Sequence, residues 1–194
     1  MKNQDLTVTE DNKFNNDLNK IQCYIFYFFM FSFAGWLLET FYSYLVLGHF
    51  TNRGFFYGPI CPIYGCGALM LIIFLDKYKN SPIKLFLYSI IVFSIFEYAI
   101  GYGLDALYNL WLWDYRTEFL NLNGRICLFY SLGWGVAALA FNYLIFPILK
   151  KIITFISSKI PTKLQLFGIR MLCMIFVIDV LYSFIEYSSL YVNI

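Results

Sequence analysis

Residues 52–75 read "NRGFFYGPICPIYGCGALMLIIFL", a cluster of turn-forming residues that leads directly into an apolar run. Such a run predicts a helix that enters a membrane, because a lipid-spanning helix needs roughly 20 mostly apolar residues. Four further segments have the same character. The sequence therefore predicts an all-α, polytopic transmembrane bundle of residues 21–194, with a polar tail at 1–20 before it. The five predicted spans lie near 21–47, 57–76, 83–108, 126–149 and 165–190.

The composition of the whole chain supports this class. Of its 194 residues 60% are hydrophobic and 13% are charged, whereas soluble domains average about 25% charged residues. Only loops and the tail remain outside the predicted spans, which leaves no room for a soluble catalytic domain. The tail lacks the apolar region and cleavage site of a signal peptide, so we expect the first helix to stay in the mature chain.

The distribution of basic residues predicts the orientation. Lysines gather in the tail and in the loops at 77–84 and 150–164, whereas Arg53, Arg116 and Arg125 lie in the other two loops. Lys and Arg accumulate in loops that remain cytoplasmic. We therefore expect a cytoplasmic N-terminus, an extracytoplasmic C-terminus, and the stretch at 52–68 at the outer surface.

Acidic residues inside the predicted spans are the first unusual feature, and they include Glu39, Glu97 and Asp105. Each charge at membrane depth costs about 2.5–3.5 kcal/mol on insertion scales, so such residues face the bundle interior and find partners. An arginine at the outer end of a helix, such as Arg53 or Arg125, can extend inward along its aliphatic stem to reach them. Two interpretations stay open: neutralisation that locks the bundle, or a polar pocket that opens outward and binds a ligand.

A weak internal repeat links two parts of the chain. An offset of 66 residues aligns 35–67 with 101–133 without a gap, and pairs Glu39 with Asp105 and Cys61 with Cys127. The identical positions, in the first copy, are Gly35, Leu38, Tyr42, Thr51, Gly58, Ile60, Cys61, Tyr64 and Gly67. The pattern suggests two parallel helical hairpins followed by half of a third. Some transporters bind their substrate between such repeats, which modestly favours a transport function.

The start of the second span has two interpretations. Gly58-Pro59 can begin the helix directly, because proline is tolerated in the first turn. Pro62 alternatively indicates a short broken segment at 57–63 before the helix, which is tolerated at membrane depth only when it is buried in protein or lines a wet cavity.

The loop at 109–125 combines interfacial aromatic residues with turn residues. Trp111, Trp113 and Tyr115 supply the aromatic rings, and Asn123-Gly124 supplies a turn. We expect this loop to fold over the outer face of the bundle and to pack against the loop at 48–58.

No pattern predicts a cofactor, a metal site or nucleic-acid binding. The five cysteines form no CxxC pair, and the sole histidine, His49, has no metal-ligating companions. No Ser-His-Asp set, HExxH motif or Gly-rich nucleotide loop is present, so we expect no enzymatic activity and no ATP hydrolysis by the chain itself.

Several motifs together carry a family resemblance: "GWLLE" (35–39), "NRGFFYGPICPIYGCGA" (52–68), "FEYAIGYGLD" (96–105), "WDY" (113–115), "NGRICL" (123–128) and "SLGWG" (131–135). Over roughly residues 30–148 the chain resembles the family labelled putative ABC-transporter type IV, the CmpB-like permeases. Asp105 stands where that family usually has Glu, and Arg116 where it usually has a small hydroxyl residue. The resemblance implies a multi-pass permease component of the bacterial cytoplasmic membrane.

The motifs and the buried acids define two sets of candidate residues. The candidate polar pocket consists of Glu39, Asn52, Arg53, Tyr64, Glu97, Asp105, Asp114, Asn123 and Arg125. The structural motif residues are Gly35, Trp36, Gly54, Gly58, Pro59, Cys61, Pro62, Gly65, Trp113, Tyr115, Gly124 and Trp134.

The leading functional hypothesis is a permease subunit whose pocket opens to the extracytoplasmic side. Besides the bilayer, its expected partners are a separate ATPase on the cytoplasmic side and further copies of the chain. One alternative is a membrane-embedded enzyme or maturation factor that uses Glu39 and Glu97 as acid and base. Another is a structural or regulatory partner of a second membrane protein.

Overall fold

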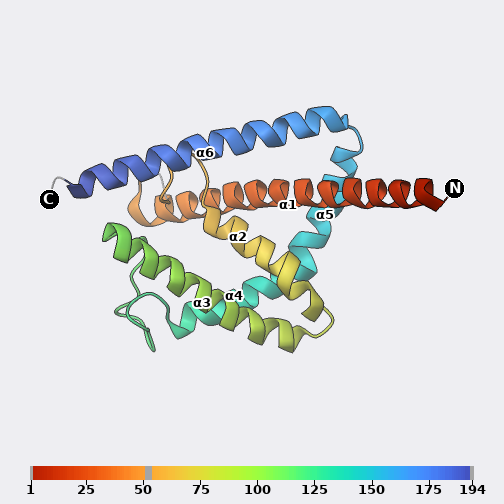
Figure 1. Ribbon diagram of the computed structural model, residues 1–194. Helices are drawn as coiled ribbons and strands as arrows, with labels where there is room; N and C mark the ends of the chain where they lie inside the picture. Colours follow the sequence, from red (N-terminus) through yellow and green to blue (C-terminus); the bar gives the residue numbers. More distant parts are fainter. Residues whose placement is uncertain (1, 51–53, 193–194) are drawn as a thin grey trace.

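The computed structural model describes residues 2–50 and 54–192, and the side chains of 20–50 and 54–187. Within these ranges the regular structure is helical (Figure 1). Six α-helices are joined by loops and by short π- and 3₁₀-helical turns. In chain order the elements are α1 (Lys2–Leu47), α2 (Pro62–Met70), the π-turn η1 (Leu71–Leu75), the 3₁₀ turn η2 (Asp76–Tyr78), α3 (Pro82–Tyr108), α4 (Leu128–Ala140), the π-turn η3 (Phe141–Ile145), α5 (Phe146–Ser157) and α6 (Thr162–Val192).

Four helical segments are long and apolar enough to cross a membrane, which confirms the polytopic helical class. They are Lys20–Leu47, Pro82–Tyr108, Leu128–Ser157 and Thr162–Tyr187. The predicted second span corresponds to the shorter run of α2, η1 and η2. The number of crossings and the orientation of the chain therefore stay predictions.

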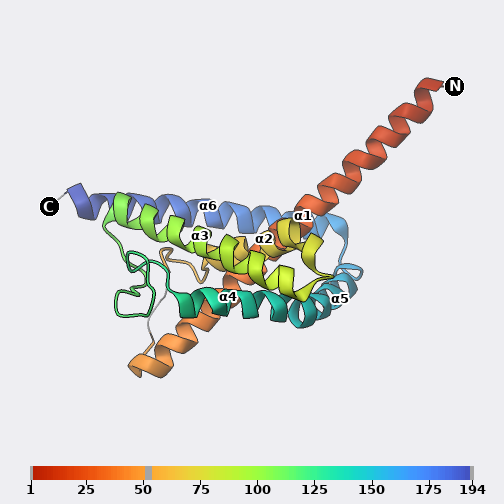
Figure 2. The same ribbon diagram turned by 90° about the horizontal axis from the view of Figure 1, so that it is seen from below.

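The helices form two hairpins and a further helix. α1 packs along α2, and α3 packs along α4. In Figure 1, α1, α3 and α6 run in one direction, and α2 and α4 run in the other. Cys61 and Cys127, the cysteines that the sequence offset pairs, occupy the N-cap positions of α2 and α4. This arrangement agrees with a parallel repeat of 35–67 and 101–133. Figure 2 shows the first part of α1 extending away from the other helices.

α2, the second helix of the first hairpin, begins at Pro62. The interpretation in which Gly58-Pro59 begins the helix is therefore wrong. Cys61 is extended (φ −118°, ψ 90°), because a proline disfavours the helical conformation in the residue before it. The Cys61 amide donates to the Ser32 carbonyl of α1 at 2.9 Å, so it is satisfied without a helix. The irregular segment at 54–61 matches the broken-segment alternative.

The helix that follows α4 continues beyond its predicted end at 149, as far as Ser157. Pro147 has no amide to donate and its ring crowds the carbonyl four residues earlier. The π-turn η3 ends two residues before Pro147. Its extra residue shifts the hydrogen-bonding pattern of the helix, which accommodates the missing amide and the crowded carbonyl. Most of the predicted loop at 150–164 is therefore helical, since 150–157 belong to α5 and 162–164 to α6.

A close crossing of α1 and α2 depends on glycines. A Cβ added at Gly35 would lie 2.3 Å from the Tyr64 ring, and one added at Gly65 would lie 2.5 Å from the Phe28 carbonyl oxygen. Neither helix leaves room for a side chain at these points, so their backbones approach as small-residue interfaces in membranes allow. The crossing places Tyr64 against the α1 face that carries Glu39.

We expect Gly65→Ala to destabilise the folded protein by about 1–3 kcal/mol, because the added methyl group overpacks an interface made partly of backbone. Thermal unfolding of the detergent-solubilised protein measures the effect. Gly133→Ala is the matched control, since a Cβ there meets nothing within 4 Å, and alanine is the better helix former. Equal melting temperatures for the two variants would contradict this packing.

Candidate functional site

A cavity of about 430 Å³ lies toward the loop end of the bundle. Its volume falls within the range of small-molecule binding sites. Both hairpins, the segment at 54–61, the loop at 109–125 and α6 contribute to its wall. The lining residues are Glu39, Gly54, Phe55, Phe56, Cys61, Pro62, Ile63, Tyr64, Cys66, Phe96, Glu97, Ile100, Leu104, Leu112, Trp113, Tyr115, Trp134 and Phe184.

Two carboxyl groups face this cavity from different helices, Glu39 from α1 and Glu97 from α3. Glu97 is only 4% exposed, and it accepts hydrogen bonds from the Tyr115 hydroxyl at 3.0 Å and from the Trp134 indole N–H at 2.8 Å. The Tyr64 hydroxyl donates to Oε1 of Glu39. The two carboxyl groups are thus held by neutral donors.

No basic side chain pairs with either carboxyl group within the described part of the chain. The ion pairs found there join Lys79 to Asp76, Arg116 to Asp114 and Arg125 to Asp105. No Lys, Arg or His is among the described residues that line the cavity. Burying a carboxylate without a counter-charge is unfavourable in free energy, and this cost determines which groups the site can bind.

A second polar cluster forms around Arg125 and is separate from the cavity wall. Arg125 pairs with Asp105 of α3, and their side chains are 12% and 22% exposed. The indole N–H of Trp111 donates to Asp105 at 2.9 Å. The guanidinium group also lies 5.1–5.7 Å from the ring centroids of Tyr98, Tyr102 and Trp111. Asp105 neutralises the charge of Arg125 in this cluster, and the cluster anchors the loop at 109–125.

A tight turn directs Arg125 at Asp105. Asn123 and Gly124 both have positive φ, 53° and 69°, as the two central residues of a type I′ turn require. The Arg125 amide closes the turn by donating to the Leu122 carbonyl at 3.1 Å, and the Leu122 amide donates to the Ile126 carbonyl at 2.9 Å.

The same loop packs along one face of α3. Tyr115 reaches Glu97, and Trp113 and Arg125 cover Gly101, where an added Cβ would lie 3.3 Å and 3.5 Å from their side chains. The Trp113 indole N–H donates to the Arg125 carbonyl at 2.9 Å. The loop therefore places Trp113 and Tyr115 on the cavity wall, opposite the segment at 54–56.

Asp114 and Arg116 lie at the exposed surface of the loop. The Arg116 side chain donates to both Asp114 oxygens, at 2.9 and 2.8 Å from its Nε. These hydrogen bonds lower the pKa of Asp114 below its ordinary value. Tyr115 lies between these two residues in the sequence. Burial and the nearby Glu97 raise the pKa of Tyr115, so its hydroxyl stays protonated as a donor.

The structure divides the candidate pocket residues. Glu39, Tyr64 and Glu97 meet at the cavity, whereas Asp105, Asn123 and Arg125 form the second cluster and Asp114 lies at the surface. Asn52 and Arg53 lie outside the described residues. The motif residues on the cavity wall are Gly54, Cys61, Pro62, Trp113, Tyr115 and Trp134.

The remaining motif residues shape the backbone. Gly35 and Gly65 form the helix crossing, and Gly124 forms the turn. The amides of Tyr57 and Gly58 each donate to an oxygen of Asp179 on α6 at 3.0 Å. These two bonds fix the segment before Pro59 against α6. Trp36 stacks on Phe33 with ring centroids 6.1 Å apart.

Sequence reasoning did not identify several lining residues, namely Phe55, Phe56, Cys66, Phe96 and Phe184. These are apolar residues in an apolar chain, so no composition signal separates them from residues that face lipid. A periodicity signal exists for Ile100 and Leu104, which follow Glu97 at helical spacings of three and seven residues on α3. The role of Phe184 depends entirely on how α6 packs.

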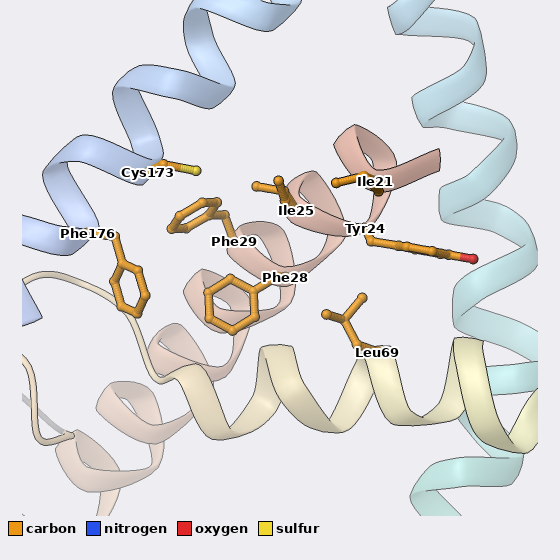
Figure 3. Close-up of a pocket in the computed structure, with 8 residues that line it drawn as sticks. All are labelled: Ile21, Tyr24, Ile25, Phe28, Phe29, Leu69, Cys173 and Phe176. Carbon is orange, nitrogen blue, oxygen red and sulfur yellow. The ribbon is translucent and has the colours of Figure 1, made fainter. Parts of the chain in front are cut away.

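A further cavity of about 290 Å³ is apolar and differs in kind. It lies between α1, α2 and α6 (Figure 3). Figure 3 shows Ile25 and Phe29 of α1 and Cys173 of α6 pointing into it, while the hydroxyl of Tyr24 points away. It presents no charged side chain, so the cavity with Glu39 and Glu97 is the candidate functional site.

We expect Arg125→Met to destabilise the protein by roughly 3 kcal/mol, because it leaves the half-buried Asp105 without its counter-charge. Replacing both residues, as Asp105→Leu with Arg125→Met, should restore part of this loss. Chemical unfolding in detergent measures each variant. Arg116→Met is the control, since it breaks a solvent-exposed pair worth about 0–1 kcal/mol. Equal losses for Arg125→Met and Arg116→Met would contradict a structural role for the Arg125 cluster.

Comparison with known proteins adds one finding. A family model described as "Putative ABC-transporter type IV" matches residues 26–184. The matched region contains both carboxyl groups and all described residues that line the cavity. Searches among curated proteins and among solved structures find no match.

Proposed function

We propose that this chain, which belongs to the family described as "Putative ABC-transporter type IV", is a membrane permease subunit whose carboxyl-lined cavity binds the transported solute. The observation that carries the proposal is the cavity itself, a space of about 430 Å³ inside an apolar bundle with two carboxyl groups on its wall. A structural lock needs partners for its acids but has no need of an enclosed space between them.

The position of the cavity supports this function. It lies where the two hairpins meet, with Glu39 and Tyr64 from the first hairpin and Glu97 and Trp134 from the second. A site at the interface of parallel repeats can open when the two halves move relative to each other. The lysine distribution favours an extracytoplasmic position of the loop end, and in this proposal the cavity opens outward in a bacterial cytoplasmic membrane.

The energy source in this proposal is a separate ATPase, because the chain has no nucleotide-binding motif. In this proposal the cytoplasmic surfaces open to such a partner are the 77–81 turn and the part of α5 that carries Lys150 and Lys151. The turn is held in place, since the Tyr143 hydroxyl donates to the Lys79 carbonyl at 2.5 Å, and Lys79 pairs with Asp76 at 2.9 Å. A preformed turn suits a docking surface between subunits.

A membrane-embedded enzyme is the second candidate, and one observation favours it. Cys66 lines the same cavity as Glu39 and Glu97, which places a thiol near two acid–base groups. We nevertheless give transport precedence, because the hydrogen bonds described for the two carboxyl groups join them to Tyr64, Tyr115 and Trp134. A variant with both Cys61→Ala and Cys66→Ala that keeps full biological activity would exclude a thiol nucleophile at this cavity.

We expect an ATPase to co-purify with the native protein from gently solubilised membranes. Mass spectrometry of the complex identifies the partner by its nucleotide-binding motif. Replacing Lys79, Lys150 and Lys151 with Glu should release it, because the change reverses the charge of the docking surface. Substitution of Lys159 with Glu serves as the control outside that surface. A stable native complex without a nucleotide-binding subunit would overturn the permease proposal.

A further inference from the structure

We propose that the cavity binds an organic cation, a small amine or quaternary ammonium ion with apolar substituents. The inference deepens the proposed function by naming the substrate class, and its role in transport rests on that function. The binding step itself depends only on the cavity. Four features of the described lining residues carry the inference: charge, hydrogen-bonding capacity, aromatic surface and the lack of a metal-ligand cluster.

The charge of the wall favours a cation. Glu39 and Glu97 are the ionisable acids among the described lining residues, and neither has a basic partner in the described part of the chain. Glu97 is only 4% exposed, so water solvates its carboxyl group poorly. A bound cation would supply the counter-charge that the protein does not supply, whereas an anion would add repulsion in a medium of low dielectric constant.

The hydrogen-bonding capacity of the wall points the same way. The strong side-chain donors among the described lining residues are all engaged. The Tyr64 hydroxyl donates to Glu39, and the Tyr115 hydroxyl and Trp134 N–H donate to Glu97. The Trp113 N–H donates to a backbone carbonyl.

Acceptor capacity remains, by contrast. A carboxylate accepts about four hydrogen bonds, and Glu39 receives one, at Oε1, from the described side chains. A ligand that fits must therefore donate hydrogen bonds or carry positive charge. Ligands that need donors from the protein, such as carboxylates and phosphates, do not meet this condition.

Half of the other described lining residues are aromatic. They come from the 54–56 segment, α2, α3, the 109–125 loop, α4 and α6, and are Phe55, Phe56, Tyr64, Phe96, Trp113, Tyr115, Trp134 and Phe184. Ring faces attract cations, by about 0.5–1 kcal/mol when exposed and about 2 kcal/mol when desolvated, and aromatic cages that recognise quaternary ammonium ions use this attraction. The rings also bury the apolar substituents of such a ligand.

Neighbouring rings hold several of these side chains in place. Trp134 stacks on Phe93 with ring centroids 5.5 Å apart, and Tyr115 stacks on Tyr130 at 4.5 Å. Phe55 is only 7% exposed and stacks on Tyr187 of α6 at 4.5 Å. The cage is therefore assembled before a ligand arrives, which reduces the entropy cost of binding.

A metal ion fits the wall less well than an organic cation. Two glutamates and two cysteines contribute to it, but no three His, Cys, Asp or Glu residues of the described chain come together as metal ligands do. A divalent ion such as Mg²⁺ usually keeps several bound water molecules. Apart from the two carboxyl groups, the aromatic side chains of the wall offer few hydrogen-bond acceptors for these waters.

Isothermal titration calorimetry on the purified full-length protein in detergent tests the inference. The probe is benzyltrimethylammonium, and benzenesulfonate is the anionic counterpart of similar size. We expect the cation to bind with saturable heat and the anion to give none. Glu39→Gln and Glu97→Gln should each weaken cation binding at least tenfold. Asp76→Asn, which removes an acid outside the cavity, should leave binding unchanged.

Melting temperature and gel-filtration profile verify that each variant is folded. Where Glu97→Gln fails this check, Glu39→Gln and Phe96→Leu carry the test, the latter because it removes a ring face while keeping an apolar side chain. Absence of cation binding, equal binding of benzenesulfonate, or binding unaffected by the cavity substitutions would overturn the inference.

These outcomes are distinct from those for the permease proposal. Cation binding by a protein that has no ATPase partner would support the inference while contradicting the proposed transport role. An ATPase partner together with a cavity that binds no cation would leave the transport role standing and would overturn the substrate class.

Discussion

The burial of carboxyl groups inside an apolar bundle is the constraint on which the rest of this structure depends. Each acid needs a partner that the lipid cannot provide, and the fold supplies partners by bringing distant segments together. The glycine crossing of α1 and α2 delivers Tyr64 to Glu39. The 109–125 loop and α4 deliver Tyr115 and Trp134 to Glu97. The cavity is the space that remains between these two sets of partners.

The parallel repeat provides the frame for the two halves but not their chemistry. Both hairpins have a cysteine at the N-cap of the second helix, and both carry an acid at the equivalent position of the first. Asp105 nevertheless meets a full positive charge on Arg125, whereas Glu39 meets a neutral phenol. The asymmetry assigns Asp105 to the anchoring cluster around Arg125 and Glu39 to the cavity wall. Asp179 of α6, in turn, accepts two backbone amides and holds the segment at 54–58.

Sequence reasoning predicted the helical class, the parallel hairpins and the carboxyl groups of the site, because hydropathy and intramembrane charge are local signals. It also predicted that arginines would meet the buried acids. Arg125 does meet Asp105, whereas Glu39 and Glu97 have no basic partner among the described residues, and Arg53 lies outside them. Sequence alone does not assign Tyr64 to Glu39 or Trp134 to Glu97, since these pairs depend on helix rotation and crossing distance. The start of α2 at Pro62 and the continuation of α5 to Ser157 depend on how two prolines are accommodated. A hydrogen bond from Cys61 to α1 decides the first, and the π-turn η3 decides the second.

The electrostatic character of the cavity is the central claim, and Cys66 on its wall tests it most directly. A variant that retains only Cys66 is reacted with a trimethylammonium and with a sulfonate methanethiosulfonate reagent of similar size. Their rate ratio is divided by the ratio for a free thiol in solution. The account predicts a normalised preference for the cationic reagent that disappears with Glu39→Gln and Glu97→Gln. A preference for the sulfonate, or no preference before these substitutions, would contradict it.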